Sequence, residues 1–179
     1  QLEARLRAQG QDWVAYAVAH YSRIDLRGVG GTAPTPIKSS FDSTGFELGG
    51  KWTPGPWVLM ATGYTGRGLG ELFGALVQFG DIKETGGYVQ VGDHLTPNWA
   101  AYLTWAASTP DKRDVIRWMG NGATGLLRNQ QTAFSLEYTA GAYGFGVELL
   151  HDKLHSTSDG VNRKTTSGNQ LSLSATYHF

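Results

Sequence analysis

The chain has 179 residues, and its 15 Lys and Arg balance its 15 Asp and Glu, so its formal net charge is zero. This balance gives no electrostatic reason to expect a nucleic-acid partner, and the absence of Cys excludes disulfides and thiolate metal sites. With 25 Gly, 12% aromatic residues and no apolar run near the ~20 residues of a membrane helix, the composition favours an antiparallel β protein with half-polar strands.

The first segment, QLEARLRAQ, has two interpretations. With a period of two, the Leu and Ala residues share one face and the charged residues share the other; with a helical period, the segment is a short amphipathic turn or the end of a coiled coil. We favour the strand because Gly10, Gln11 and Asp12 then form a short turn into the apolar segment WVAYAVAHY. The strand interpretation gives nine strands in the chain. The helix would leave eight, which is enough for a small barrel to close alone.

Two-residue alternation recurs along the rest of the chain. It is clearest in the last segment, NQLSLSATYHF, where Leu171, Leu173 and Tyr177 alternate with polar residues. The segment that starts at Trp57 is apolar on both faces at first, so its orientation stays open. The nine expected strands are residues 2–9, 12–24, 43–53, 57–66, 83–95, 98–108, 127–139, 142–153 and 169–179.

The connections between these strands alternate between short and long. Short turns contain PGP, TPN or AG, whereas residues 26–42, 67–81, 110–125 and 155–167 form long connections. This alternation is typical of outer-membrane barrels, which have short periplasmic turns and long extracellular loops. The sequence therefore predicts an all-β, antiparallel transmembrane β-barrel, with residues 1–179 as a single segment of it. Because bacterial single-chain barrels have even strand numbers, nine strands predict a larger barrel whose other strands precede Gln1.

Several stretches resemble the DcaP-like family of outer-membrane porins: YTGRGLGELFG at 64–74, GGYVQVGDHLTPNWAAYLTW at 86–105, LRNQQTAFSLEYTAGAYGFGVELLHDKL at 127–154 and GNQLSLSATYHF at 168–179. The resemblance implies a homotrimer in the outer membrane of a Gram-negative cell, in contact with lipid and lipopolysaccharide. It also implies passive diffusion of small hydrophilic, often anionic, solutes. A C-terminal Phe is the usual assembly signal of such barrels, and Phe179 matches it.

If the apolar faces meet lipid, the opposite faces line the lumen and carry the residues that tune selectivity. Arg5 and Arg7, on one strand face, are the strongest candidates for attracting an anion, and Arg67 beside the Gly-rich loop would narrow the pore by folding inward. The strand candidates for the pore lining are Glu3, Arg5, Arg7, Glu47, Lys51, Glu137 and Glu148. An aromatic girdle is expected next to the short turns, formed by Tyr16, Trp52, Trp57, Trp99, Tyr138, Tyr143 and Tyr177.

Other functions have weaker sequence support. His151 and His155 leave a strand rather than share a helix face, which argues against a metal site, and the Gly-rich segment 66–74 lacks the GK[ST] of a phosphate loop. No nucleophile motif is present, so we expect neither an enzyme nor a cofactor. The remaining alternatives are a plugged eight-stranded barrel with a structural or adhesive role, an outer-membrane hydrolase, and a soluble β-sandwich or lipocalin-like binder.

Overall fold

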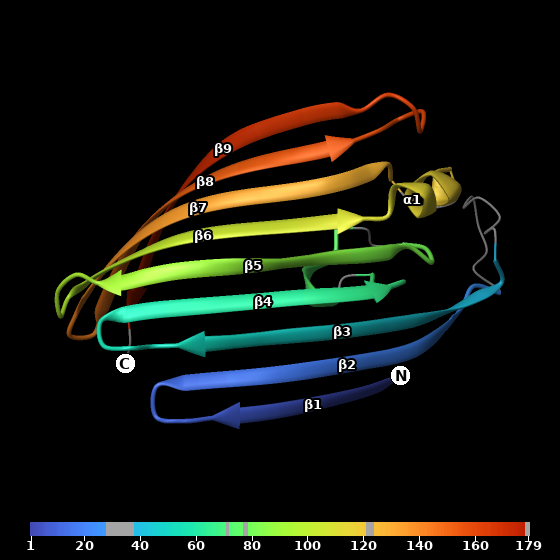
Figure 1. Cartoon of the computed structure of the whole chain (residues 1–179). Helices are drawn as coiled ribbons and strands as arrows, with labels where there is room; N and C mark the ends of the chain where they lie inside the picture. Colours follow the sequence, from blue (N-terminus) through green and yellow to red (C-terminus); the bar gives the residue numbers. More distant parts are fainter. Residues whose placement is uncertain (28–37, 71, 77–78, 121–123, 178–179) are drawn as a thin grey trace.

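The computed structural model describes residues 1–27, 38–70, 72–76, 79–120 and 124–177. They form one antiparallel sheet in which every strand pairs with its neighbours in chain order (Figure 1). The elements are β1 (Leu2–Gln9), β2 (Trp13–Asp25), β3 (Ser40–Trp52), β4 (Trp57–Arg67), η1 (Leu72–Gly74), β5 (Lys83–His94), β6 (Trp99–Pro110), α1 (Lys112–Trp118), β7 (Leu126–Ala140), β8 (Tyr143–Ser156) and β9 (Lys164–Tyr177). The nine-stranded, all-β prediction is confirmed.

The N-terminal segment is a strand. Residues 2–9 pair along their whole length with β2, in a register that runs from Leu2–Tyr21 to Gln9–Val14. The helical alternative, and the eight-stranded arrangement that depended on it, are therefore wrong. The segment forms a strand because the backbone of β2 provides hydrogen-bond partners along its length, and because the two-residue period of QLEARLRAQ fits a pleated strand with one apolar side.

Short and long connections alternate along the sheet. The short turns follow β1, β3, β5 and β7 and gather at one end of the sheet, whereas the long connections and α1 gather at the other end (Figure 1). Among the described residues, no helix is both long and apolar enough to span a membrane.

Two long connections differ from their predicted form. Residues 112–118 form α1, because the Asp111 side chain caps the helix by accepting hydrogen bonds from the amides of Arg113 and Asp114 at 2.9 and 3.0 Å. The connection between β8 and β9 is only residues 157–163, since β9 begins at Lys164 rather than residue 169. The polar run KTTSG lacks apolar alternation, and pairing with the extended β8 makes it a strand.

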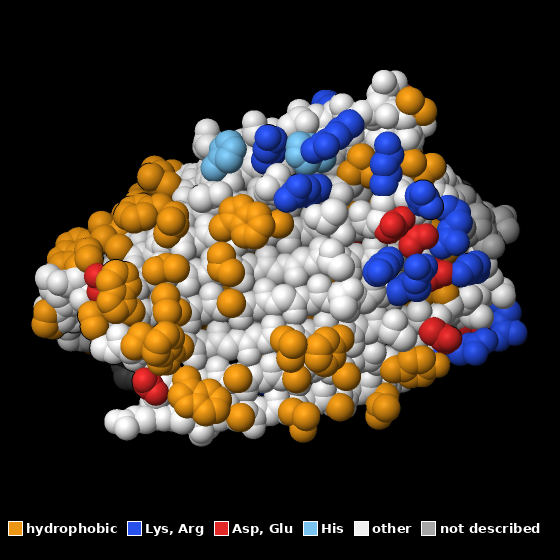
Figure 2. All heavy atoms as spheres, viewed as in Figure 1, with side chains coloured by type: hydrophobic (Ala, Val, Ile, Leu, Met, Phe, Trp, Pro, Cys, Tyr) orange, Lys and Arg blue, Asp and Glu red, His pale blue; other side chains and the backbone are white. Residues whose placement is uncertain are grey.

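One side of the sheet is apolar and exposed to the surroundings. It carries large hydrophobic side chains from every strand, with Leu6 at 77%, Leu103 at 57% and Leu173 at 75% exposure. Figure 2 shows many of them gathered on one face. The register also settles the orientation of β4, because Leu59 pairs with Val91 on this side and Met60 pairs with Gln90 on the other. We call this side the apolar face and the opposite side the polar face.

Most of the expected aromatic girdle lies on the apolar face at the short-turn end. Trp99 and Tyr138 form one close ring pair, 4.8 Å between centroids, and Tyr143 and Tyr177 form another at 5.1 Å. The prediction that Tyr16 belongs to this girdle is wrong. It pairs with Arg7 and Gly49, and its hydroxyl lies 3.0 Å from that of Thr62, all on the polar face.

Candidate functional site

The pairing register places all seven strand candidates for the pore lining on the polar face. Cross-strand partners share a face, so Arg7, Tyr16, Gly49, Thr62 and Tyr88 form one continuous row across β1 to β5. Equivalent rows contain the candidates, which are Glu3, Arg5, Arg7, Glu47, Lys51, Glu137 and Glu148. The strand pleat thus brings these charges to one surface; their part in selectivity remains a prediction.

Some of these charges are held by neighbouring side chains. The guanidinium of Arg5 lies over the ring of Tyr16, 5.2 Å from its centroid, a cation–π contact. Glu3 pairs with the buried His20 at 3.1 Å, and Glu148 accepts a hydrogen bond from the Ser135 hydroxyl at 3.0 Å. The cations Arg5, Arg7 and Lys51 come from β1 and β3, whereas Glu137 and Glu148 come from β7 and β8. Glu3 and Glu47 also lie on β1 and β3, so the cations among the seven strand candidates are confined to these two strands, whereas the candidate carboxylates are spread across the wall.

The connection between β4 and β5 folds onto the polar face. Its Phe73 stacks on Tyr64 with 6.2 Å between ring centroids, and Phe73 is a non-glycine residue with a positive φ of 56°. In Figure 1 this segment lies behind β4 and β5, on the side opposite the apolar face. This left-handed backbone conformation is strained for a residue other than glycine, and the stacking of Phe73 on Tyr64 offsets the strain.

A buried polar cluster anchors that connection to the sheet. The Glu84 carboxylate is 2% exposed; it accepts hydrogen bonds from the Tyr64 hydroxyl at 3.0 Å, from the amide of Leu76 at 2.5 Å and from the Ser108 hydroxyl. Tyr64 and Ser108 also lie 2.8 Å apart at their oxygens. Because a buried carboxylate needs such partners, this cluster fixes residues 72–76 against β4, β5 and β6.

A small cavity of about 290 Å³ remains between this connection and the sheet. Four aromatic side chains, from Tyr16, Tyr64, Phe73 and Tyr88, line it together with polar groups such as Glu47 and Gln131. Amphipathic rings and hydrogen-bonding groups suit contact with a small hydrophilic solute that carries an apolar part. Sequence reasoning missed Tyr64, Phe73 and Glu84, since nothing in local alternation indicates that a distant connection returns to them.

Arg67 does not turn toward the polar face. It is the last residue of β4 and pairs with Thr44 and Lys83, in step with the apolar face. Its guanidinium is held by Asp81 at 3.1 Å and Asp114 at 3.3 Å. The expected inward fold of Arg67 is therefore wrong, because Asp81 and Asp114 hold the arginine at the end of the sheet that carries the long connections. The segment with Phe73 covers the polar face instead.

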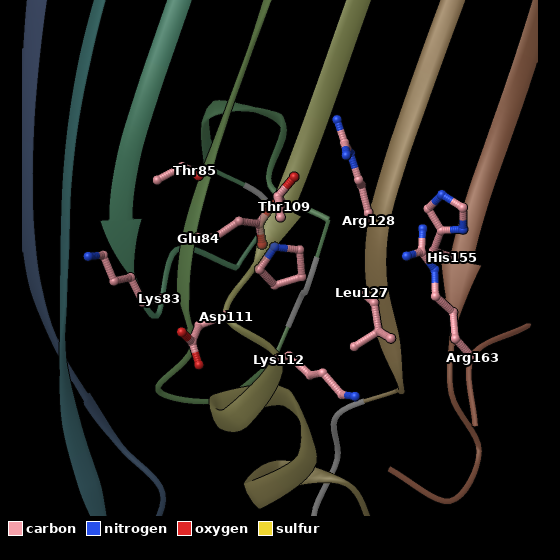
Figure 3. Close-up of a pocket in the computed structure, with 11 residues that line it drawn as sticks. Lys83, Glu84, Thr85, Thr109, Asp111, Lys112, Leu127, Arg128, His155 and Arg163 are labelled. Carbon is pink, nitrogen blue, oxygen red and sulfur yellow. The ribbon is translucent and has the colours of Figure 1, made fainter. Parts of the chain in front are cut away.

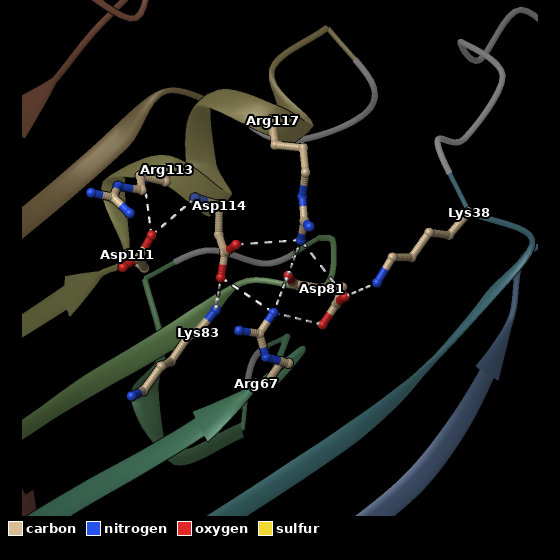
Figure 4. Close-up of polar contacts among 8 residues, drawn as sticks. All are labelled: Lys38, Arg67, Asp81, Lys83, Asp111, Arg113, Asp114 and Arg117. Carbon is tan, nitrogen blue, oxygen red and sulfur yellow. Dashed lines mark hydrogen bonds and ion pairs between the residues drawn. The ribbon is translucent and has the colours of Figure 1, made fainter.

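Arg67 belongs to an ionic network at this end of the sheet, which we call the mouth (Figure 4). The network consists of Lys38, Arg67, Asp81, Asp114 and Arg117. Asp81, whose side chain is 6% exposed, pairs with Lys38 and Arg67 and lies 3.7 Å from Arg117. Arg117 also pairs with Asp114 at 3.3 Å. Burial raises the pKa of Asp81, but hydrogen bonds from Lys38 and Arg67 outweigh it, so the pKa lies below its ordinary value. The network ties three long connections together.

Beside this network lies the main apolar core of the mouth. Trp118 and Val115 of α1 are fully buried against Leu26, Phe41 and Ile82. Phe41 and Trp118 meet edge to face at 5.9 Å. The assembly signal expected at Phe179 lies outside the described residues.

The fold is similar to that of a known channel. The crystal structure of the outer membrane channel DcaP of Acinetobacter baumannii superimposes with a TM-score of 0.77 over 99% of this chain, at 17% sequence identity. The fold is that of about half of the DcaP barrel. The chain spans about half the length of that channel, since it covers 51% of it. The similarity confirms, at the level of the fold, the resemblance seen in the sequence.

Sequence comparisons add nothing to this structural match. No protein-family model matches the chain, and no curated protein matches it in sequence.

Proposed function

We propose that this chain forms part of the wall of a porin-like channel that lets small hydrophilic solutes diffuse across an outer membrane. The observation that carries the proposal is the division of one sheet into two faces. Large hydrophobic side chains are exposed on one face, and charges share the other. A soluble sheet would bury its apolar side, whereas a transmembrane barrel turns it to lipid. The similarity to DcaP supports the same assignment.

The two edges of the sheet support a larger wall. Among the described strands, β1 pairs only with β2 and β9 only with β8. In a bilayer, unpaired backbone groups at such edges are costly, so membrane-spanning sheets close into barrels. We therefore propose that further strands complete the barrel, and that three such barrels form a homotrimer, as the family resemblance implies.

We propose anionic solutes as the preferred class. Arg5 and Arg7 project from adjacent rows of the polar face, and Lys51 adds a third cation two strands away. Together with the carboxylates of β7 and β8 they would set up a field across the lumen. The inward-folded residues 72–76, anchored by Glu84, would narrow the passage.

The test is planar-bilayer conductance of the detergent-extracted full-length protein under a salt gradient. A channel of this kind gives stepwise conductance, in groups of three for a trimer, with a reversal potential on the anion side. Folded, heat-modifiable protein that conducts nothing would contradict the proposal and favour a plugged barrel or an outer-membrane enzyme. Hydrolysis of lipid or peptide substrates without conductance would identify the enzyme.

A further inference from the structure

A basic pocket lies at the end of the sheet nearest α1. It has a volume of about 610 Å³ and is open to the surroundings (Figure 3). Residues of β5, β6, α1, β7 and β8 line it, together with Asp111 and Arg163 from two connections. Its basic residues are Lys83, Lys112, Arg128, His155 and Arg163, with Glu84 and Asp111 as its acidic ones. We call it the basic pocket.

The basic pocket opens on the apolar face. Thr85 and Thr109, which line it, are cross-strand partners and continue the row pattern of Val89 and Trp105. Arg128 pairs with His155, in step with Phe134 and Leu149 further along the same two strands. Figure 2 shows Lys, Arg and His side chains gathered beyond the hydrophobic ones, toward the end that carries α1. The pocket is therefore separate from the candidate pore lining.

The pocket exists because two strands part there. The ladder between β5 and β6 continues to Glu84–Pro110, whereas the one between β6 and β7 ends at Ser108–Asn129. An irregularity between Leu126 and Arg128 shifts the register of β7 against β8 at the same level. Such bulges re-aim side chains at sheet ends, and Leu127, which lies at this one, also lines the pocket.

The positive charges around the pocket are not neutralised within the described part of the chain. None of Lys83, Lys112, Arg128, Lys153 and Arg163 forms an ion pair there, in contrast to Arg67 and Arg117 at the mouth. The Nε of Arg128 is buried without a hydrogen-bond partner among the described residues. Buried polar groups ordinarily have one, so the hydrogen-bonding capacity of this guanidinium is not fully used among the described residues.

The two carboxylates of the pocket are already engaged. Glu84 accepts hydrogen bonds from Tyr64 and Ser108 on the other side of the sheet, and Asp111 caps α1. Arg128 is the cross-strand partner of His155, whose Nδ1 lies 2.9 Å from the Thr165 hydroxyl. An uncompensated cluster of this kind favours an anion with several acceptor oxygens.

Next to the basic pocket, the apolar face has a groove that could hold an alkyl chain. Thr85 and Thr109 line both the basic pocket and a second hollow of about 360 Å³, which Val89 and Trp105 bound further along the apolar face. A phosphate site that continues into an apolar groove matches an amphiphile. A free anion would use only the upper part.

We propose that the basic pocket binds a phosphate group of lipopolysaccharide, with the groove beside Trp105 taking part of an acyl chain. The proposal rests on the proposed function, because it requires the apolar face to meet lipid with the long connections on the extracellular side. In that orientation the pocket lies where the apolar face ends, at the level of the outer-leaflet headgroups.

Native mass spectrometry of the detergent-extracted full-length protein tests this proposal. The probes are bisphosphorylated lipid A, monophosphorylated lipid A, phosphatidylethanolamine and inorganic phosphate. We expect the bisphosphorylated lipid to bind most tightly. The double variant Lys112→Gln/Arg163→Gln, at two exposed positions, should weaken that binding at least about tenfold through the loss of two charge-assisted contacts.

The matched control is Arg7→Gln/Lys51→Gln, which removes the same two residue types from the polar face and should leave lipid A binding unchanged. Equal weakening in both variants, or equal binding of phosphatidylethanolamine, would overturn the proposal. Binding of inorganic phosphate alone would reassign the pocket to a free anion. Loss of the trimer in the test variant would reassign it to a subunit contact.

Folding and function are scored separately on the same samples. Heat-modifiable migration on a gel reports folding of each variant, and Arg128→Gln provides a second test at the residue with the unpartnered Nε. A wild-type protein that binds lipid A but does not conduct would contradict the proposed function alone. A conducting protein without selective lipid A binding would contradict only the lipid site.

Discussion

Arg5 and Arg7 lie two positions apart on β1, and the pleat of the strand therefore projects both from the polar face. Arg5 is oriented by its contact with the ring of Tyr16, whereas Arg7 forms no ion pair among the described residues. The face from which a charged side chain projects therefore determines which surroundings the charge meets. In the proposed channel, the same residue type on the apolar face would meet lipid or headgroups.

Replacement of both arginines, Arg5→Gln/Arg7→Gln, should lower anion preference. Two fixed positive charges disappear from the lumen wall, so the reversal potential in a salt gradient should move toward the cation side. Planar-bilayer recordings measure it. Arg23→Gln serves as control, because Arg23 pairs with Asp42 in step with the apolar face. An unchanged reversal potential in the double variant would remove these two residues from the selectivity mechanism.

Asp81 allows a prediction about pH. Its folded pKa lies below the ordinary 3.8, so its contribution to stability is present above pH 3.8 and is lost as the pH falls through the lower folded value. Hydrogen exchange should show residues 79–82 and 112–118 protected at pH 6 and at pH 5, and released only in stronger acid. Asp81→Asn should release them already at pH 6. Asp42→Asn, at an exposed position, is the control, and protection that survives in the Asp81 variant would contradict the prediction.

At the scale of elements, the segment that folds onto the polar face depends on glycine in the strands beneath it. A Cβ on Gly86 would lie 2.4 Å from the Tyr64 hydroxyl oxygen, because the tyrosine lies flat across that glycine. Tyr64 in turn contacts Phe73, Glu84 and Ser108. The strand glycine therefore makes the anchor of the connection 68–82 possible.

Gly86→Ala should displace Tyr64 and loosen that connection. Forcing a methyl group into an occupied space typically costs about 1–3 kcal/mol, so the unfolding temperature should fall and single-channel current should become noisier. Gly63→Ala is the matched control on the neighbouring strand, since its Cβ would meet nothing closer than the Gly86 carbonyl oxygen at 4.0 Å. The same loss in both variants would mean that Tyr64 does not position the connection.

At the scale of the whole molecule, the two faces demand different surroundings. The apolar face exposes large side chains from every strand, and the polar face gathers charges, tyrosines and amides. Neither aqueous solvent alone nor lipid alone satisfies both, so the sheet suits a wall between the two. The ionic network and the core around Trp118 lie at its mouth.

Adjacent residues near the middle of β6 test this division. Leu103→Arg places a charge on the apolar face, where an arginine at the bilayer midplane costs about 2–4 kcal/mol, so the folded fraction in lipid vesicles should drop. Thr104→Arg introduces the same side chain on the polar face, next to Gln90, and should fold like the unaltered protein. Heat-modifiable gel migration measures the folded fraction. Equal folding of the two variants would contradict a lipid-facing role for Leu103.

The strands, their faces and the alternation of short and long turns can be predicted from local sequence patterns. Two-residue periodicity is a local property, so the alternation within QLEARLRAQ and within NQLSLSATYHF identifies the apolar and polar faces of each strand without reference to the rest of the chain. The seven strand charges therefore reached the polar face as predicted. Tyr16 was misassigned because its nearness to a turn was given more weight than its place in the alternation.

The course of the chain beyond the regular strand ladder depends instead on contacts between distant segments. The inward course of residues 72–76 depends on Glu84, Tyr64 and Ser108 meeting across three strands. The holding of Arg67 at the mouth depends on carboxylates 14 and 47 positions further along the chain. The basic pocket depends on the parting of β6 from β7. Contacts between distant segments follow from register and packing, which no local pattern of side chains specifies.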